Sequence, residues 1–312
     1  MLAVLITSAG TARAEFDWGA KYAGDYLSGQ SSARLLALGG TGVAISSGPS
    51  AMLANPAMIF SESNHDLSLM HADRFSSAVK VDHANYIRMQ PDGTAIGFGF
   101  LRQGVDDISL SESLRDPSLP LSSTNRPVIT GSTSASEYAF ILAYAREGRY
   151  GQLGGTAKLL YKHLYDSRAY GLGIDIGYAR SFGGLTVGAQ LRDALTTILV
   201  WDTGRQEGIV PTVRVGAAYQ LEIERLQATI LPVVEVVART ETWGNDDFLS
   251  VKAGFEYTIS HVVSARIGYD EDRLTYGAGL NLGMIAANYA FLNDEDLGAI
   301  HRISLRIQWG QH

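Results

Sequence analysis

The feature that most constrains the fold of this chain is an alternation of apolar and polar residues with period two, from about Asp66 to Trp309. Successive side chains of a β-strand point to opposite faces, so this pattern predicts strands with one apolar and one polar face. In the last segment Ile303, Leu305, Ile307 and Trp309 alternate with Arg302, Ser304, Arg306 and Gln308. Similar segments lie near residues 263–270, 249–257, 213–220 and 171–178.

The polar faces of these segments are rich in small residues, and the chain contains 34 glycines. A soluble β-sandwich also alternates, but its polar faces meet water and need no such glycine content. Small residues on the polar face suit a crowded interior. The pattern therefore favours a barrel with an apolar outer surface.

Composition and charge exclude two classes of protein. Apart from the extreme N-terminus, the sequence has no apolar run of the roughly 20 residues that a spanning helix needs, so any membrane crossing must be by strands. The net charge of -7 and the lack of clustered Lys and Arg argue against a nucleic-acid partner.

Counting the alternating segments predicts about fourteen strands, an even number as in bacterial single-chain barrels. They lie near residues 66–72, 77–89, 94–102, 136–146, 152–164, 169–181, 184–193, 210–222, 226–239, 248–259, 262–270, 272–281, 284–292 and 298–309. The even-numbered connections are tight, and the long polar connections, such as residues 103–135 and 194–209, are all odd-numbered. Short turns on one side and long loops on the other are typical of outer-membrane barrels. We therefore predict an all-β fold: residues 64–312 form a transmembrane antiparallel β-barrel in the lipid bilayer of a bacterial outer membrane.

The first 14 residues resemble the end of a secretory signal peptide. An apolar run from Leu2 to Ile6 leads to the small-residue pattern Ala12-Arg13-Ala14, with cleavage expected after Ala14. The positively charged start of such a peptide is missing, so we expect residues 1–14 to be a truncated signal peptide. An apolar N-terminal strand is the alternative.

Residues 15–63 lose the alternation and are too few and too apolar to fold alone. Asn55 before Pro56 suits the start of a short helix to about Phe60, because asparagine caps helices and proline fits their first position. The barrel lumen is the nearest place in which this block can bury itself. We therefore predict that residues 15–63 form a plug inside the barrel. The residues expected to define it are Arg34, Gly39, Gly40, Asn55, Pro56 and Ala57.

Three sets of motifs follow one another along the chain. They are Ala33-Arg34, Leu38-Gly39-Gly40 and Asn55-Pro56-Ala57; then Gly173-Ile174-Asp175-Ile176-Gly177, Leu191-Arg192-Asp193-Ala194 and Pro211-Thr212-Val213-Arg214-Val215-Gly216; then Asp296-Leu297-Gly298 and His301-Arg302-Ile303-Ser304-Leu305. Together they resemble the PorV/PorQ-like outer-membrane proteins, relatives of the FadL long-chain fatty-acid transporters. The resemblance implies a barrel of about fourteen strands whose N-terminal segment occludes the lumen. The chain departs from the family at its end, where Gly310-Gln311-His312 follow Trp309, and in its short length of 312 residues.

Three possible sites have simpler explanations. The run of residues 39–42 lacks the Lys-Ser or Lys-Thr of a phosphate loop, and residues 294–296 match no calcium loop. A lipase-like pair of serine and histidine lacks a nucleophile elbow and an acid. We instead expect the histidines at the membrane interfaces or on the lipid-facing ends of strands. They are His71, His83 and His163.

Charged residues on the predicted inward faces are the main functional candidates. They are Lys80, Asp82, Lys158, Lys162, Asp175, Arg192, Arg214, Glu235, Arg239, Lys252, Glu256, Arg266 and Asp270. Both signs occur, so we favour ion pairs that join strands across the lumen over a substrate path. Arg34 of the plug could join this network.

The sequence predicts a non-enzymatic protein without cofactor or metal and leaves two functions open. One is the uptake or passage of hydrophobic molecules; the alternative is a non-transporting docking or shuttle component of type IX-like secretion, which would bind a secreted protein domain. A transporter should carry an apolar pocket above the plug, lined by aromatic residues from the outer loops. Residues 103–135 contain leucines but no aromatic residue.

Overall fold

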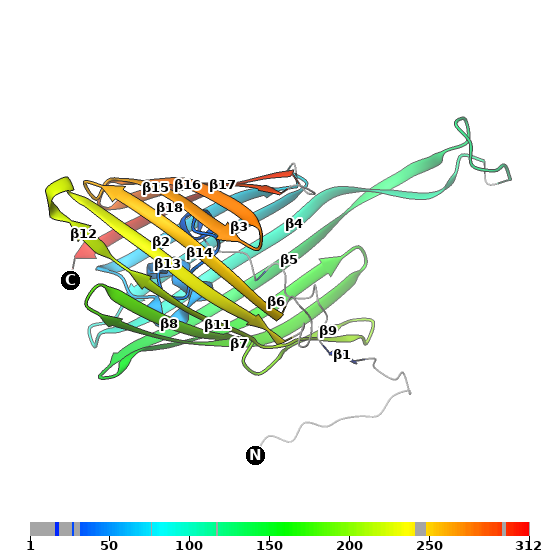
Figure 1. Ribbon diagram of the computed structural model, residues 1–312. Coiled ribbons are helices and arrows are strands. Elements are labelled where there is room, and N and C mark those ends of the chain that lie inside the picture. The colour runs from blue at the N-terminus through cyan, green and yellow to red at the C-terminus, as the bar shows by residue number, and fades with distance from the viewer. Residues whose placement is uncertain are drawn as a thin grey trace, which may run out of the picture.

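The wall of the molecule is an antiparallel sheet of 14 strands. The sheet closes on itself, as the computed structural model in Figure 1 shows. The structure describes residues 16–18, 27, 32–75, 77–116, 118–240, 248–294 and 298–311, so the predicted signal peptide lies outside it. The wall strands are β2 (Ser63–Arg74), β3 (Val79–Met89), β4 (Thr94–Leu114), β5 (Pro127–Gly148), β6 (Gly151–Leu164), β7 (Ser167–Phe182), β8 (Leu185–Arg192), β11 (Thr212–Tyr219), β13 (Ala228–Arg239), β14 (Leu249–Ile259), β15 (Val263–Asp270), β16 (Arg273–Asn281), β17 (Ile285–Asp294) and β18 (Gly298–Gln311). The last of these strands, β18, pairs with β2 and closes the ring.

Four short strands of the described residues lie outside this ring order. In the sequence, the hairpin of β9 (Thr197–Trp201) and β10 (Gln206–Ile209) lies between β8 and β11. These two wall strands nevertheless pair directly with each other. β9 also pairs with β7, and β1 (Phe16–Trp18) lies parallel to β10. At the other end of the wall, β12 (Leu221–Ile223) and the 3-10 helix η3 (Glu224–Leu226) continue from β11.

The wall turns its apolar side chains outward. Along β15, Val263 and Ile267 are exposed, whereas Ser264 and Arg266 are buried. Large exposed apolar side chains recur on every side of the ring, with Leu172 62% and Ile303 59% exposed. A continuous apolar outer surface on a sheet without free edges suits contact with lipid, where every backbone group must be paired within the protein.

The structure confirms the closed barrel of about fourteen strands that the alternation predicts. The prediction of a long loop at residues 103–135 is wrong, because β4 and β5 pair as far as Leu114 and Pro127. This part of the hairpin projects beyond the wall (Figure 1). It meets water on both faces and its register is irregular between Val105 and Ser113, so its sequence does not alternate. The predicted loop at 194–209 likewise contains β9 and β10.

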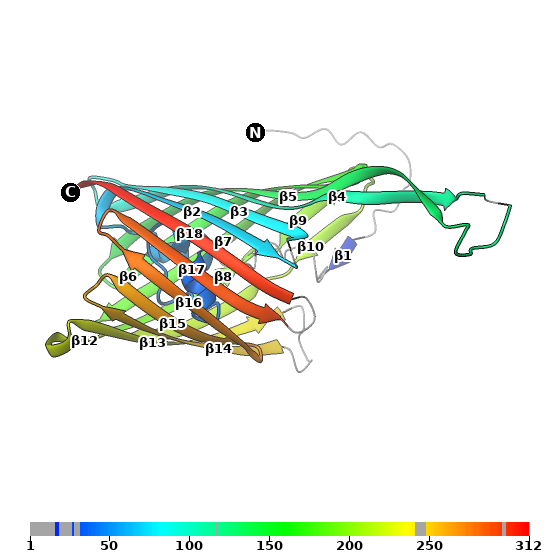
Figure 2. The ribbon, with the colours of Figure 1, turned by 90° about the horizontal axis from the view of Figure 1, so that it is seen from above.

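A run of short helices lies within the ring of strands, and appears in blue behind and between them in Figures 1 and 2. It comprises α2 (Ala33–Ala37), η1 (Gly48–Ser50), α3 (Ala51–Ala54) and η2 (Pro56–Met58). We call residues 32–60 the interior segment. Asn55 caps η2 by accepting from the Ala57 N–H, with Pro56 at the first position. The predicted helix to Phe60 is in the structure a single 3-10 turn.

Apolar side chains of the interior segment form the protein's core with the inner face of the wall. Met52 and Ile59 pack with Ile87, Leu101 and Ile141 on one side. On other sides, α2 packs against β15 to β18, and Val43 packs with Val233. Among the described residues, no helix combines the length and the apolar character needed to span a membrane.

Candidate functional site

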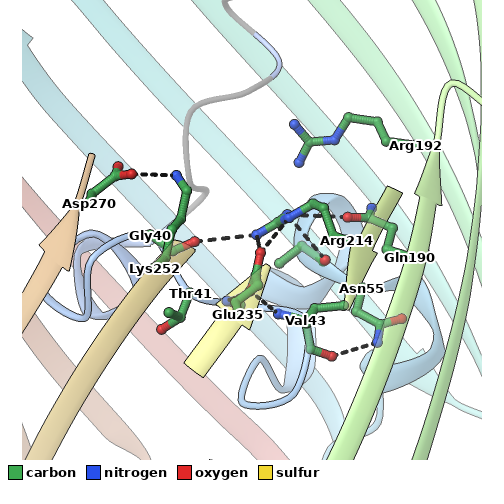
Figure 3. A network of polar contacts seen from close by, with 12 residues as sticks. Gly40, Thr41, Val43, Asn55, Gln190, Arg192, Arg214, Glu235, Lys252 and Asp270 are labelled. Atoms are coloured by element: carbon green, nitrogen blue, oxygen red, sulfur yellow. Dashed lines mark hydrogen bonds and ion pairs between the residues drawn. The ribbon is translucent and has the colours of Figure 1, made fainter. Parts of the chain in front are cut away.

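An ion pair of the wall holds the middle of the interior segment (Figure 3). The Glu235 carboxylate on β13 accepts from the backbone N–H of Gly42 at 2.7 Å and of Val43 at 3.0 Å. It also accepts from Arg214 Nε on β11 at 2.6 Å, and Arg214 Nη2 donates to the Gly40 carbonyl at 3.3 Å. Glu235 is 1% exposed. A carboxylate that binds a guanidinium and two backbone N–H groups fixes the segment by charge-assisted hydrogen bonds.

Glycines on both sides let the segment lie directly on the wall. Gly39 has a φ of +71°, which favours glycine. A side chain on Gly268 of β15 would overlap the Gly39 backbone nitrogen, and one on Gly188 of β8 would overlap the Val43 carbonyl. The glycine-rich inner faces therefore provide the clearance that this close packing requires.

Arg34 connects α2 to the wall. Its guanidinium donates to Glu256 of β14 at 2.8 and 2.9 Å and to the Ile45 carbonyl at 3.1 Å. Arg266 of β15 pairs with the same carboxylate. Glu256 thus pairs with one guanidinium of the interior segment and with one of the wall.

The Asn55-Pro56-Ala57 motif contacts the opposite side of the ring. The Asn55 side-chain amide donates to the Val43 carbonyl at 2.7 Å and to the Tyr178 carbonyl of β7 at 3.0 Å. Side chains at Gly154 and Gly177 would overlap Pro56 and Asn55, respectively. The proposed plug motif therefore lies against β6, β7, β14 and β15.

The remaining predicted charges form separate clusters. Lys158 Nζ lies 2.6 Å from Asp175 Oδ1 and 2.7 Å from Asp193 Oδ1, with Lys158 and Asp175 fully buried. Arg192 donates to the Leu53 carbonyl at 3.2 Å, and Lys252 pairs with Asp270 at 2.7 Å. The wall thus carries several local charge clusters and not one continuous network.

Three residues do not lie where the alternation predicts. Lys80 and Asp82 are on the outer face of β3, where Asp82 pairs with His71. We expect His83 at a membrane interface or on a lipid-facing strand end, but it points inward and is 4% exposed, so it does not face lipid. The inner face of β3 contacts the apolar interior segment through residues such as Ile87, so the usual rule of polar inside and apolar outside fails there.

An apolar pocket of about 210 Å³ lies at the outer end of the wall, where the projecting hairpin begins. Its apolar lining includes Val79, Val105, Leu164 and Trp201. Lys162 and Glu137, 2.6 Å apart, form its polar side. Sequence reasoning sought an aromatic residue within 103–135 and missed Trp201, which reaches the pocket from β9. Among the described residues, no three potential metal ligands cluster together. Glu295 and Asp296 of the calcium candidate lie outside the described range.

No protein-family profile and no curated protein sequence matches the chain. Solved structures with the same fold include a mutant of the TodX monoaromatic hydrocarbon channel lacking S2 and S3, with 12% identity over 88% of this chain and 97% of that chain and a TM-score of 0.54. A FadL homologue of Pseudomonas aeruginosa has 10% identity over 89% of this chain and 98% of that chain, also with a TM-score of 0.54. These similarities establish the barrel fold. With the apolar outer surface of the wall, they place the chain in the bacterial outer membrane.

Proposed function

We propose that this chain is an outer-membrane channel for small hydrophobic molecules, with residues 15–63 as the plug of its lumen. The observation that carries the proposal is the apolar pocket at the outer end, lined by Val79, Val105, Leu164 and Trp201. Apolar pockets with a few polar groups are the usual sites for hydrophobic ligands. The FadL-like fold of the wall supports the same function.

Uptake by whole cells tests the pocket. Cells that express the chain should accumulate labelled toluene or oleate faster than cells that do not. Trp201→Glu should reduce this uptake several-fold, because it places a charge in the apolar lining. Leu195→Glu is the matched control, since Leu195 belongs to the same outer loop but is 74% exposed and does not line the pocket. Equal uptake by the two variants would refute the role of the pocket.

Conductance across a planar bilayer tests the plug. The intact protein should be closed to ions, and deletion of residues 32–60 should open a water path while the strands still pair. An intact protein that conducts as well as the deletion variant would refute the plug.

A second function, docking of a secreted protein domain, is favoured by the projecting part of the β4–β5 hairpin (Figure 1). Its tip is held by Asn125, which is 5% exposed and whose amide donates to the Asp116 and Leu119 carbonyls at 2.9 and 3.0 Å. Around this ordered tip, Leu121 is 71% and Ile129 66% exposed. The motifs that resemble the PorV/PorQ-like proteins support this alternative.

Excision of the hairpin separates the two functions. Val105 and Ala135 are paired across β4 and β5, so residues 106–134 can be replaced by a two-residue Asn-Gly turn. The shortened chain should assemble and migrate as a heat-modifiable barrel. If it loses capture of secreted proteins but keeps uptake, the hairpin is a docking element on a channel. Loss of capture without any uptake by the intact chain would favour docking alone.

A further inference from the structure

A second cavity, of about 290 Å³, lies at the end of the barrel opposite the apolar pocket, between the interior segment and the wall. His261 in the β14–β15 turn and Asn281 at the end of β16 both line it. This is the end with the short turns, which faces the periplasm in outer-membrane barrels. The cavity is therefore separate from the site proposed for hydrophobic uptake.

The lining of this cavity has an excess of positive charge. The lining contains three guanidiniums, those of Arg34, Arg266 and Arg306, and one carboxylate, that of Glu256. The carboxylate of Asp66, buried behind the lining, neutralises Arg306 through contacts at 2.9 and 3.0 Å to its Nε. Glu256 is shared between the other two guanidiniums. Three guanidiniums against two carboxylates leave one positive charge without a counter-charge of its own.

Arg266 lines this cavity and carries a hydrogen-bond donor that lacks an acceptor. Its side chain is 4% exposed, and its Nε is used by Glu256. Its Nη1 is buried and has no acceptor among the described residues. A buried donor without an acceptor is costly, and the cost is greater for a charged group. An anionic oxygen in the cavity would supply the missing acceptor.

A wall glycine lets this guanidinium lie directly against the sheet. A Cβ on Gly279 would stand 2.6 Å from both Nη atoms of Arg266 and 2.8 Å from the Asn288 side-chain oxygen. The Arg266 guanidinium and the Asn288 amide thus both lie next to Gly279, which has no side chain. Hydroxyl groups, such as those of Ser264 and Thr258, complete the lining.

We propose that this cavity is a binding site for an oxyanion group (carboxylate, phosphate or sulfate) that enters from the periplasmic side, with Arg266 as its principal donor. A guanidinium presents paired N–H groups in a planar fork that matches two oxygens of such a group. The ligand would contact Arg34 of the interior segment as well as the wall. The proposal does not depend on passage of hydrophobic molecules, so either can fail without the other.

Titration calorimetry on the full chain in detergent micelles, at constant ionic strength, tests this site with two probes. They are inorganic phosphate and the soluble lipid dihexanoyl phosphatidic acid, with chloride as the reference anion. We expect saturable binding with one site per chain. If phosphate binds with the same affinity as the lipid, the ligand is a free anion. If the lipid binds markedly more tightly than phosphate, the ligand is a lipid headgroup. Either result supports oxyanion recognition.

Two variants locate the binding. Arg266→Lys keeps the charge but loses the fork, and should weaken binding about tenfold. Arg239→Lys is the matched control, because Arg239 pairs with Glu271 and does not line the cavity. Gly279→Ala displaces the Arg266 guanidinium without changing any charge, and should also weaken binding while the barrel stays heat-modifiable. Failure of both probes to saturate, or equal weakening by Arg266→Lys and Arg239→Lys, would overturn the proposal.

Discussion

Glu235 is the residue on which the position of the interior segment most depends. Its carboxylate accepts from two backbone N–H groups of the segment and from Arg214 of the wall. The carboxylate and Arg214 are both buried. Removing one member of such a pair leaves the other as an uncompensated buried charge.

Glu235→Ala should therefore destabilise the folded protein by about 3–5 kcal/mol, the usual cost of breaking a buried ion pair. It should also raise the conductance of the intact chain, because residues 42 and 43 lose their acceptor. Urea unfolding in lipid vesicles measures the first effect and bilayer recording the second. The control is Glu271→Ala, in the half-exposed pair with Arg239, which should cost about 0–1 kcal/mol and leave conductance unchanged. Similar behaviour of the two variants would contradict this assignment.

At the scale of the strand, β6 shows how the two faces of the wall differ. Gly154 and Gly155 are neighbours on this strand. A side chain on Gly154 would overlap the Pro56 backbone of the interior segment, whereas one on Gly155 would stand 3.4 Å from the nearest atom, the Asp175 carbonyl oxygen. Position 154, on the inner face, therefore has no space for a side chain, whereas position 155, on the outer face, can accommodate one.

Gly154→Ala should cost about 1–3 kcal/mol of stability, because the added methyl group forces the segment away from the wall. Gly155→Ala is the matched control, because it makes the same substitution on the same strand, and it should have little effect. The measurement is the urea midpoint of each variant in vesicles. A larger loss in Gly155→Ala would show that the interior and exterior faces of β6 are assigned the wrong way round.

At the scale of the whole molecule, two groups of aromatic side chains mark the borders of the lipid-facing surface. His301 packs with Tyr289 and Phe291 near the start of β18, and Trp309 stacks with His65 near its end. Trp309 lies eight positions after His301, roughly 27 Å along a strand and about 20 Å across the membrane at a tilt near 40°. This span is close to the roughly 25 Å apolar band of outer-membrane barrels. Leu305 lies midway between the two groups.

Leu305→Arg should impair assembly by about 2–4 kcal/mol, since a charge at the membrane midplane faces lipid without a partner. His301→Arg places the same charge on the same face of the same strand at the border, where the expected cost is about 0–1 kcal/mol. The two variants are refolded into vesicles, and the fraction of each that migrates as a folded barrel on an unheated gel is compared. Equal folded fractions would mean that this face of β18 does not meet lipid.

Sequence patterns predict the wall because the inside and outside of a strand differ residue by residue, as in Ile303 and Ser304. The cap formed by Asn55 and Pro56 is predictable for a similar reason, since it depends on adjacent residues. Trp201 and the ion pair of Asp193 with Lys158 were missed because they depend on distant partners. Asp193 lies beyond the end of β8 with a φ of +53°, outside any alternation, and meets Lys158 only through the folded ring. The projecting hairpin was missed because neither of its faces is buried.

The close contacts of the interior segment also connect strands that lie far apart in the sequence. The η2 turn contacts β6 and β7, in the first half of the ring. The partners of α2, on β15 to β18, are the last strands in the sequence. The ring then closes where β18 meets β2, more than 200 residues away along the chain. The interior segment thus joins the strands that close the ring to strands of its first half, so contacts across the lumen link the two halves of the wall in addition to its strand pairing.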